Sequence, residues 1–157
     1  TEGRYWRLPV PAETAPEGLT RAQAELELRE RFDDSVKARL LADVPLGAFL
    51  SGGIDSTLVV AAMAKLTGQP VKTFSIGFQE PAYDETAQAR ESAVFYGTEH
   101  HEQIVSPDSI ALTERLVETF DEPFADSSAI PTYLVSELAR RHVKVVLSGD
   151  GGDELFG

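Results

Sequence analysis

The stretch Val44-Pro-Leu-Gly-Ala-Phe-Leu50, followed directly by Ser51-Gly-Gly-Ile-Asp-Ser56, decides the fold. Its first seven residues are almost continuously apolar, which is typical of a parallel strand that is covered on both faces. Two glycines then allow a sharp turn. From Ile54 to Leu66 apolar residues recur at helical spacing, until Gly68 ends the pattern. The stretch therefore predicts a strand, a tight turn and a helix.

Apolar strands and helical segments continue to alternate along the chain. Near-continuous apolar runs predict further strands at 71–78 and 143–147, and a short strand is expected at 102–105. Helices are expected at 20–40, 84–96, from Ser106-Pro107 onward, and at 130–141; Thr20 and Gln23 form a capping-box pattern at the first of them. This alternation predicts an α/β fold, a Rossmann-like parallel sheet flanked by helices. We expect strand 44–50 to lie between the strands at 71–78 and 143–147.

Residues 1–18 and 19–157 differ in character. The first segment holds Pro9, Pro11 and Pro16, and each proline removes a backbone donor and blocks helix or ladder formation. We therefore interpret residues 1–18 as a linker and residues 19–157 as one organised domain.

The composition is that of a soluble globular protein of 157 residues, with 42% hydrophobic and 25% charged residues. Cysteine is absent, which excludes disulfides, thiolate metal sites and a cysteine nucleophile within these residues. No apolar run approaches the roughly 20 residues of a membrane span, and the sequence does not open on a secretory leader. We expect a cytoplasmic protein with no membrane partner.

The chain is strongly acidic, with 26 acidic against 14 basic residues and a net charge of −12. A chain of this charge repels a polyphosphate backbone, so we expect no nucleic-acid partner. An anionic ligand would need backbone N–H groups or a metal cation to overcome the carboxylates.

The segment Ser51 to Ser56 has the features of a site for such an anion. It lies where a strand ends and a helix begins, and open α/β sheets bind ligands at the carboxyl ends of their strands. The unpaired N–H groups of the first helical turn attract an anion, and both serines add hydroxyl donors. Asp55 would oppose phosphate unless it holds a metal. The alternative is an ordinary serine-capped glycine turn. The segment is neither a Walker A loop nor a dinucleotide fingerprint, because the lysine and the glycine spacing are lacking.

A second glycine-rich segment, Ser148-Gly-Asp-Gly-Gly-Asp-Glu154, follows the strand at 143–147. Its carboxylates suit Mg²⁺, which proteins hold with one or two carboxylates plus substrate phosphates. Asp55 and Asp153 could share one Mg²⁺ if their strands are neighbours, and the metal would then turn an acidic mouth into a phosphate site. The alternative is a solvated or calcium-like acidic turn.

Together these segments resemble those of a known family. Ser51 to Ser56 looks like the PP-loop signature of the N-type ATP pyrophosphatases. Residues 148–157 are similar to the second signature of the asparagine synthetase branch, and the resemblance covers about residues 19–157. The Tyr5-Trp6-Arg7 tail resembles the exit from that family's N-terminal glutaminase domain, so the chain is expected to be the N-terminal part of the synthetase domain.

The resemblance implies an ATP site with Mg²⁺ as cofactor. Adenine and ribose would contact Leu50 and Ile76, largely through backbone. The pyrophosphate portion would be held by Ser51, Gly52, Gly53, Asp55 and Ser56, with Ser148 and Gly149 on the other side. Asp55 and Asp153 would hold Mg²⁺, and Asp150 would lie near the reacting centre in a catalytic role. Asp84-Glu85 and Asp126-Ser127-Ser128 would reach the mouth of the site.

The reaction that the resemblance implies joins aspartate to ammonia. The aspartate side-chain carboxylate attacks the α-phosphorus of ATP, which gives an acyl adenylate and pyrophosphate, and ammonia then displaces AMP. The family's glutaminase uses an N-terminal cysteine, which is lacking here, and the family continues beyond the second signature into a segment that carries a further lysine and much of the acceptor pocket. We therefore expect the 157 residues alone to lack the full activity, and to self-associate, as a homodimer in the simplest case.

Other readings stay open at this point. A β-lactam synthetase shares the adenylating architecture but activates a different carboxylate. An argininosuccinate or NAD synthetase type also has a serine-glycine-glycine loop, but its second signature differs. A non-catalytic module that senses ATP would bind ATP–Mg²⁺ without turnover. His100 and His101 would face opposite sides of a strand, so they are not expected to chelate one metal together.

Overall fold

The computed structural model describes residues 3–6, 18–79, 85–105, 109–122 and 124–156. The three prolines of the predicted linker, Asp84, the Ser106-Pro107 helix start and Gly157 lie outside the described residues. The chain divides into two compact units, Thr1–Phe32 and Asp33–Gly157, and each is described by itself. The predicted linker boundary at residue 18 stays a prediction.

The first unit holds the start of helix α1 (Arg21–Arg39). The capping box is confirmed, because the backbone N–H of Thr20 donates to Gln23 Oε1 at 2.9 Å and the N–H of Gln23 donates to Thr20 Oγ1 at 3.3 Å. Two unpaired donors at the helix start are satisfied in this way. Leu26 and Leu28 of this helix are exposed, as are Tyr5 and Trp6.

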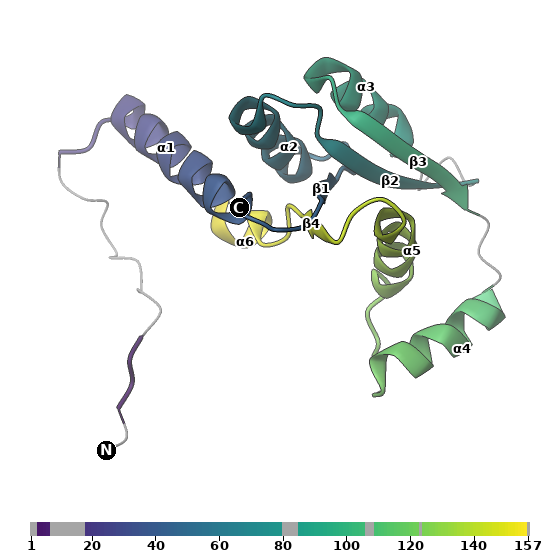
Figure 1. Cartoon of the computed structure of the whole chain (residues 1–157). Helices are drawn as coiled ribbons and strands as arrows, with labels where there is room; N and C mark the ends of the chain where they lie inside the picture. Colours follow the sequence, from purple (N-terminus) through teal and green to yellow (C-terminus); the bar gives the residue numbers. More distant parts are fainter. Residues whose placement is uncertain (1–2, 7–17, 80–84, 106–108, 123, 157) are drawn as a thin grey trace. The chain divides into compact units, whose positions relative to one another are not determined.

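The second unit is built on a four-stranded parallel sheet in the order β3-β2-β1-β4 (Figure 1). The strands are β1 (Leu46–Phe49), β2 (Lys72–Phe78), β3 (Glu99–Val105) and β4 (Val145–Leu147). The predicted fold class is confirmed, and β1 lies between β2 and β4 as expected. β3 is longer than predicted, since all seven of its residues pair with β2. The polar residues that it carries as an edge strand give no apolar pattern from which this length could be predicted.

The helices of this unit agree with the sequence patterns except at the end of the chain. They are α2 (Ile54–Thr67), α3 (Thr86–Tyr96), α4 (Ser109–Phe120), α5 (Ala129–Arg140) and α6 (Gly152–Phe156). Gly68 and Gly97 adopt the left-handed conformation that ends α2 and α3. The short helix α6 was not predicted, because its residues had been interpreted as a loop of glycines and carboxylates.

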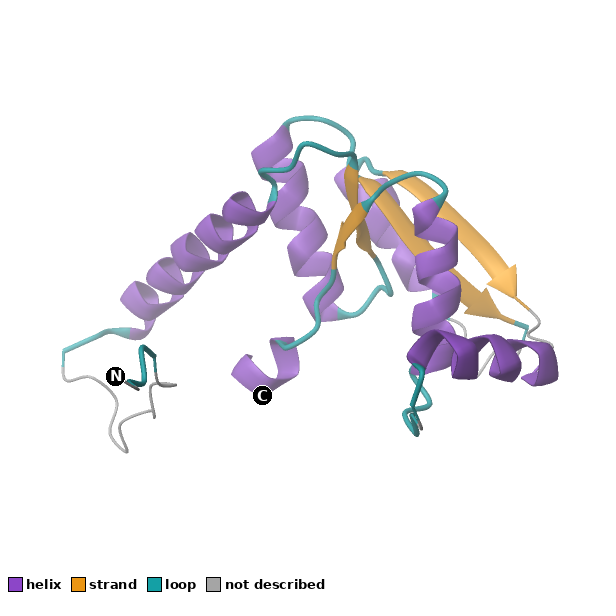
Figure 2. Cartoon of the chain, turned by 60° about the horizontal axis from the view of Figure 1, so that its bottom comes forward, coloured by secondary structure: helices purple, strands orange, loops and turns teal. Residues whose placement is uncertain are grey.

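The helices cover both faces of the sheet. α2 and α3 pack on one face and α5 packs on the other (Figure 1, Figure 2). The chain runs outward from β1 through β2 to β3 and then returns past β2 to place β4 beside β1. The β1–β4 boundary is therefore a topological switch point: the connection that leaves β1 runs through α2 on one face, and the connection that enters β4 runs through α5 on the other.

The core on the α5 face centres on Phe74, which is fully buried. Leu138, Ala139 and Val143 pack around it. Its ring also stacks on the imidazole of His101, with 5.4 Å between ring centroids. No helix among the described residues is long and apolar enough to cross a bilayer.

We expect Phe74→Ala to lower the free energy of unfolding by about 3–5 kcal/mol, because it removes a large, fully buried side chain from the core and leaves a cavity. Denaturant unfolding of the intact protein measures the loss. Phe95→Ala is the matched control: Phe95 lies on the outside of α3 with 81% of its surface exposed, and its loss should stay within about 0.5 kcal/mol. Equal losses in the two variants would contradict the assigned core.

Candidate functional site

Two glycine loops meet at the switch point of the sheet. The first glycine loop, residues 51–56, follows β1 and leads into α2. The second glycine loop, residues 148–154, follows β4 and leads into α6. Because β1 and β4 are parallel neighbours, their carboxyl ends lie at the same edge of the sheet, and the loops face each other there.

Hydrogen bonds between Ser51 and Ser56 hold the first glycine loop in shape. Ser56 Oγ donates to the carbonyl of Gly53 at 3.2 Å and accepts from the backbone N–H of Ser51 at 3.2 Å. The hydroxyl oxygens of the two serines lie 3.1 Å apart, and Ser51 Oγ accepts from the N–H of Gly53. The hydroxyl of Ser56 is therefore used inside the loop, and Ser51 is the more exposed of the two.

Gly52 fixes how the first glycine loop meets helix α3. Its φ is +88°, a conformation that side-chain-bearing residues rarely adopt. A Cβ there would lie 2.6 Å from Cβ of Gln88 and 2.7 Å from the backbone N of Ala89. Gly52 thus turns the backbone against α3 and lines neither of the cavities described below.

The second glycine loop lies directly against the first turn of α2. A Cβ on Gly149 would meet the backbone of Asp55 and Ser56 at 2.7–2.8 Å, and one on Gly152 would lie 2.5 Å from Cγ of Asp55. Both positions therefore need glycine for this close approach. Ser148 Oγ donates to Asp150 Oδ2 at 2.9 Å, which orders the start of the loop.

The two loops enclose a polar cavity of about 400 Å³. Of the site residues predicted from the sequence, Ser51, Gly53, Asp55, Ser56, Ser148, Gly149, Asp150 and Asp153 line it; Phe49, Gly151, Gly152 and Glu154 line it too. None of its lining residues, which are drawn from the described part of the chain, is basic. The cavity is thus built from glycine backbone, serine hydroxyls and carboxylates.

A second cavity of about 210 Å³ adjoins the first and shares Phe49 and Ser51 with it. Leu50 and Ile76, the predicted contacts of adenine and ribose, line this second cavity, whereas the predicted contact Gly52 lines neither cavity. Its walls are mostly apolar and come from β1, β2, α3 and α5. A ligand with a flat apolar part and an anionic part could therefore extend from the second cavity into the first.

Several lining residues of the second cavity were not predicted. Phe74 and Phe78 come from β2, and Pro131, Thr132 and Val135 come from α5. The sequence indicated the α5 helix but not that it packs against β2, beside the end of β1 where this cavity lies. Glu85 also lines this cavity, and its expected place at the mouth of the site stays a prediction.

Asp126 lies elsewhere than expected. It lines a third, largely apolar cavity between α4 and α5 and neither of the two cavities at the glycine loops. Its carboxylate accepts from the backbone N–H of Ser128 at 2.8 Å, and this hydrogen bond lowers the pKa of Asp126 below its usual range. The contact makes Asp126 the cap of a turn that precedes α5.

The donor set of the first cavity suits a hard cation that also contacts an anionic ligand. Asp55 and Asp153 both line the cavity, and Mg²⁺ is commonly held by one or two carboxylates and substrate phosphates. The described residues contain no group of three or more His, Cys, Asp or Glu side chains that could hold a metal ion. The residues present thus fit a magnesium ion that binds together with phosphate.

The sheet order, the switch point and the paired loops define a Rossmann-like α/β domain with its ligand site at the strand ends. Comparison with known proteins then places the chain more closely. It belongs to the asparagine synthase family, whose model matches residues 27–157.

Curated relatives share the sequence over most of this chain. It is 44% identical over 132 residues to asparagine synthetase [glutamine-hydrolyzing] 1 of Bacillus subtilis, covering 83% of this chain and 21% of the relative. It is 50% identical over 126 residues to putative asparagine synthetase [glutamine-hydrolyzing] 2 of Methanocaldococcus jannaschii, covering 79% and 24%. The chain thus spans between a fifth and a quarter of the length of these relatives.

The fold is also found in a solved structure. The NH3-dependent NAD synthetase of Campylobacter jejuni, in complex with the nitrate ion, matches with a TM-score of 0.54 and 15% sequence identity. The match covers 84% of this chain and 60% of that one. At this identity the likeness shows the architecture alone.

We expect alanine at Gly149 to disturb the site more than alanine at Gly152. A Cβ on Gly149 meets backbone, which cannot move aside, and overpacking of this kind costs about 1–3 kcal/mol. A Cβ on Gly152 meets the Asp55 carboxylate, so Asp55→Ala should relieve it. A double-mutant cycle by denaturant unfolding checks this: Asp55→Ala should rescue Gly152→Ala and leave Gly149→Ala impaired. Rescue of both or of neither would contradict the packing of the loops.

Proposed function

We propose that this chain forms the ATP site of an amide-forming ligase, which activates the side-chain carboxylate of aspartate as its adenylate so that ammonia can convert it to asparagine. The observation that carries the proposal is the pair of adjoining cavities at the switch point, one apolar and one lined by both glycine loops. The names of the curated relatives support the choice of product.

ATP would occupy the two cavities in one direction. Adenine and ribose would lie in the apolar cavity beside Leu50 and Ile76, and the phosphates would lie in the polar cavity. The first turn of α2 supports this direction: its N-cap is Gly53, which makes no side-chain cap hydrogen bond. The backbone N–H groups there remain available for phosphate oxygens, with the positive end of the helix dipole behind them.

Asp55 and Asp153 would hold Mg²⁺ against the phosphates. The ion supplies positive charge that offsets repulsion between phosphate and the four acidic residues of the cavity, Asp55, Asp150, Asp153 and Glu154. Each unscreened pair of like charges about 4 Å apart costs roughly 4 kcal/mol at an effective dielectric near 20. A helix N-terminus contributes only about 0.3–1 kcal/mol. The acidity of the cavity therefore favours a nucleotide that arrives with its cation.

The proposed reaction needs positioning and charge neutralisation more than covalent help from the protein. A carboxylate oxygen of aspartate attacks the α-phosphorus of ATP, the bond to the bridging oxygen of pyrophosphate breaks, and pyrophosphate leaves. Ammonia then adds to the acyl carbon, loses a proton, and AMP leaves. Asp150 lines the polar cavity and accepts a hydrogen bond from Ser148, and we assign it to the reacting centre.

The rest of the activity belongs to the whole protein. The relatives are named for glutamine hydrolysis, and we propose a glutaminase domain as the ammonia source in the full-length protein. This chain contains no cysteine for such a reaction. A homodimer and a cytoplasmic location stay predictions.

We expect ATP to bind only together with Mg²⁺, and Asp55→Asn to weaken that binding by about tenfold or more, a loss of roughly 1.4 kcal/mol. Calorimetric titration of both proteins, with Mg²⁺ and with chelator, measures the effect. Glu91→Gln is the matched control, since Glu91 is an exposed carboxylate on α3 outside both cavities. Equal affinity in all titrations would remove Asp55 from the site.

We also expect the intact protein to exchange labelled pyrophosphate into ATP when aspartate is present, because adenylation is reversible. Asp150→Asn should slow this exchange far more than it weakens ATP binding, if Asp150 acts at the reacting centre. Exchange that requires another carboxylate instead of aspartate would indicate a β-lactam-synthetase-like enzyme. Binding of ATP–Mg²⁺ without exchange under any carboxylate would indicate a sensor.

A further inference from the structure

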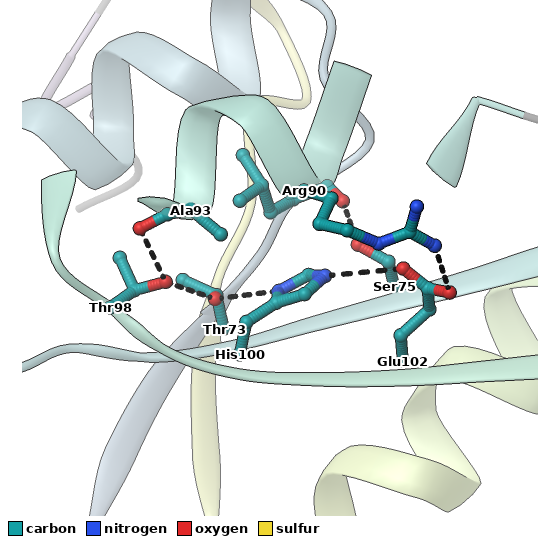
Figure 3. A network of polar contacts seen from close by, with 8 residues as sticks. Thr73, Ser75, Arg90, Ala93, Thr98, His100 and Glu102 are labelled. Atoms are coloured by element: carbon teal, nitrogen blue, oxygen red, sulfur yellow. Dashed lines mark hydrogen bonds and ion pairs between the residues drawn. The ribbon is translucent and has the colours of Figure 1, made fainter. Parts of the chain in front are cut away.

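A chain of mostly half-buried polar groups connects helix α3 with strands β2 and β3 (Figure 3). It begins at the carbonyl of Ala93, to which Thr98 Oγ1 donates at 3.4 Å. Thr98 Oγ1 lies 2.9 Å from Thr73 Oγ1, and Thr73 Oγ1 lies 2.9 Å from Nδ1 of His100. The chain ends where His100 Nε2 faces Glu102 Oε2 at 3.8 Å.

This chain of polar groups has one proton too few to form a hydrogen bond at each of its contacts. Both ends, a carbonyl oxygen and a carboxylate oxygen, can only accept. Between them stand two hydroxyls and one neutral imidazole, and each of these carries one proton. Three protons must therefore serve four contacts, so one contact has no proton at any moment.

The distances identify the contact without a proton. The two contacts of 2.9 Å are normal hydrogen bonds, and the contact at 3.4 Å is a long one. The contact between His100 and Glu102 is too long for a hydrogen bond, and both of its atoms are buried without a partner among the described residues. His100 therefore carries its proton on Nδ1, and its Nε2 lone pair faces a carboxylate oxygen.

Glu102 is also connected to residues of α3 and β2 that hold the first glycine loop in place. Glu102 Oε1 accepts from Arg90 at 2.7 Å, and Arg90 follows Gln88 and Ala89, the residues of α3 that lie under Gly52. On β2, the register partner of Glu102 is Ser75, whose hydroxyl donates to the carbonyl of Leu50 directly before the loop. Movement of Glu102 would thus reach the loop from two sides.

We propose that His100 and Glu102 form a proton-binding pair that positions the first glycine loop. Uptake of one proton from solvent on His100 Nε2 gives the missing hydrogen bond to Glu102, draws the two side chains together and changes how α3 and Ser75 support the loop. His100 and Glu102 act here as positioning residues, since neither lines the two cavities of the site. An effect of this proton on nucleotide binding, through the position of the loop, rests on the proposed function. The proton-binding pair itself does not rest on it.

The charges around His100 decide when this proton binds. From β3 it is influenced by Glu102 and His101, and from α3 by Arg90, whereas β2 presents the uncharged Thr73. Burial, the largest effect, lowers the pKa of His100 below its ordinary value, and the Glu102 carboxylate opposes this only in part. His100 is therefore neutral at pH 7.5, and the second proton binds on the acid side of the usual histidine range.

The variant Glu102→Gln should supply the missing proton permanently. Its amide N–H can donate to His100 Nε2 while its amide oxygen still accepts from Arg90. The variant should therefore resemble the protonated pair at every pH. A carboxylate that serves only as the ion-pair partner of Arg90 would behave in the opposite way, because the amide would then weaken the structure.

Histidine and glycine resonances of the intact protein, labelled with nitrogen-15 and recorded without nucleotide, test the proposal. In the unaltered protein at pH 7.5 we expect His100 to be protonated on Nδ1 and bare on Nε2. On acidification the amide signals of Gly52 and Gly53 should shift together with the titration of His100. In Glu102→Gln these two signals should already lie near their acid positions at pH 7.5 and should stay there.

Control and contrary outcomes separate this proposal from a purely structural role. His101→Gln is the matched control, because His101 faces Phe74 and His142 on the other side of β3. In this variant the shifts of the glycine signals should remain pH-dependent. A proton on Nε2 at pH 7.5, seen in the unaltered protein, would overturn the proposal without any variant. Glycine signals of Glu102→Gln that match the neutral protein would overturn it as well. Because no nucleotide is present, neither outcome depends on the proposed function.

Discussion

The parallel pairing of β1 with β4 is the constraint on which the rest of the structure depends. It places two glycine loops, about 100 residues apart along the chain, at one edge of the sheet. Their contact is so close that Gly149 and Gly152 leave no room for a side chain against Asp55 and its neighbour. Each loop alone would be a polar turn of ordinary kind. Together they line a cavity with backbone, hydroxyl and carboxylate groups, for which we propose a phosphate ester and its cation as ligands.

The acidic residues of this site also restrict which ligands it would accept. Carboxylates line the polar cavity without a basic residue among its described lining residues, so an anionic ligand is repelled unless a divalent ion accompanies it. The apolar cavity beside it adds a requirement for a flat, poorly solvated group. The ATP–Mg²⁺ complex that we propose as the ligand would satisfy both requirements. The family to which the chain belongs is consistent with this ligand, and the relatives' names connect the site with asparagine synthesis.

Much of the fold could be predicted because its signals are local. Continuous apolar runs marked β1, β2 and β4, and glycines at 68 and 97 marked the ends of α2 and α3. The extent of β3 could not be predicted, because an edge strand with residues such as Glu99 and Gln103 carries no apolar pattern. The glycine loops were recognisable from their residue types. The part of the apolar cavity that α5 lines could not be predicted from residue types. Thr132 and Val135 come to line it because the chain passes back over the sheet through α5 before it forms β4. The expected opposite orientation of His100 and His101 is confirmed by their different partners, Thr73 for the first and His142 for the second.

The order of strands also has a kinetic consequence. β2 and β3 pair residues only about 27 positions apart, whereas β1 and β4 pair residues about 100 positions apart. The entropy lost on closing a loop grows with its length, and contacts between distant parts of a chain form slowly. The β1–β4 ladder is also the shorter of the two, with three residue pairs against seven. The pairing of β4 with β1, which completes the cavity, therefore carries the largest loop-closure entropy of the three strand pairings. A ligand that contacts both loops would stabilise this pairing.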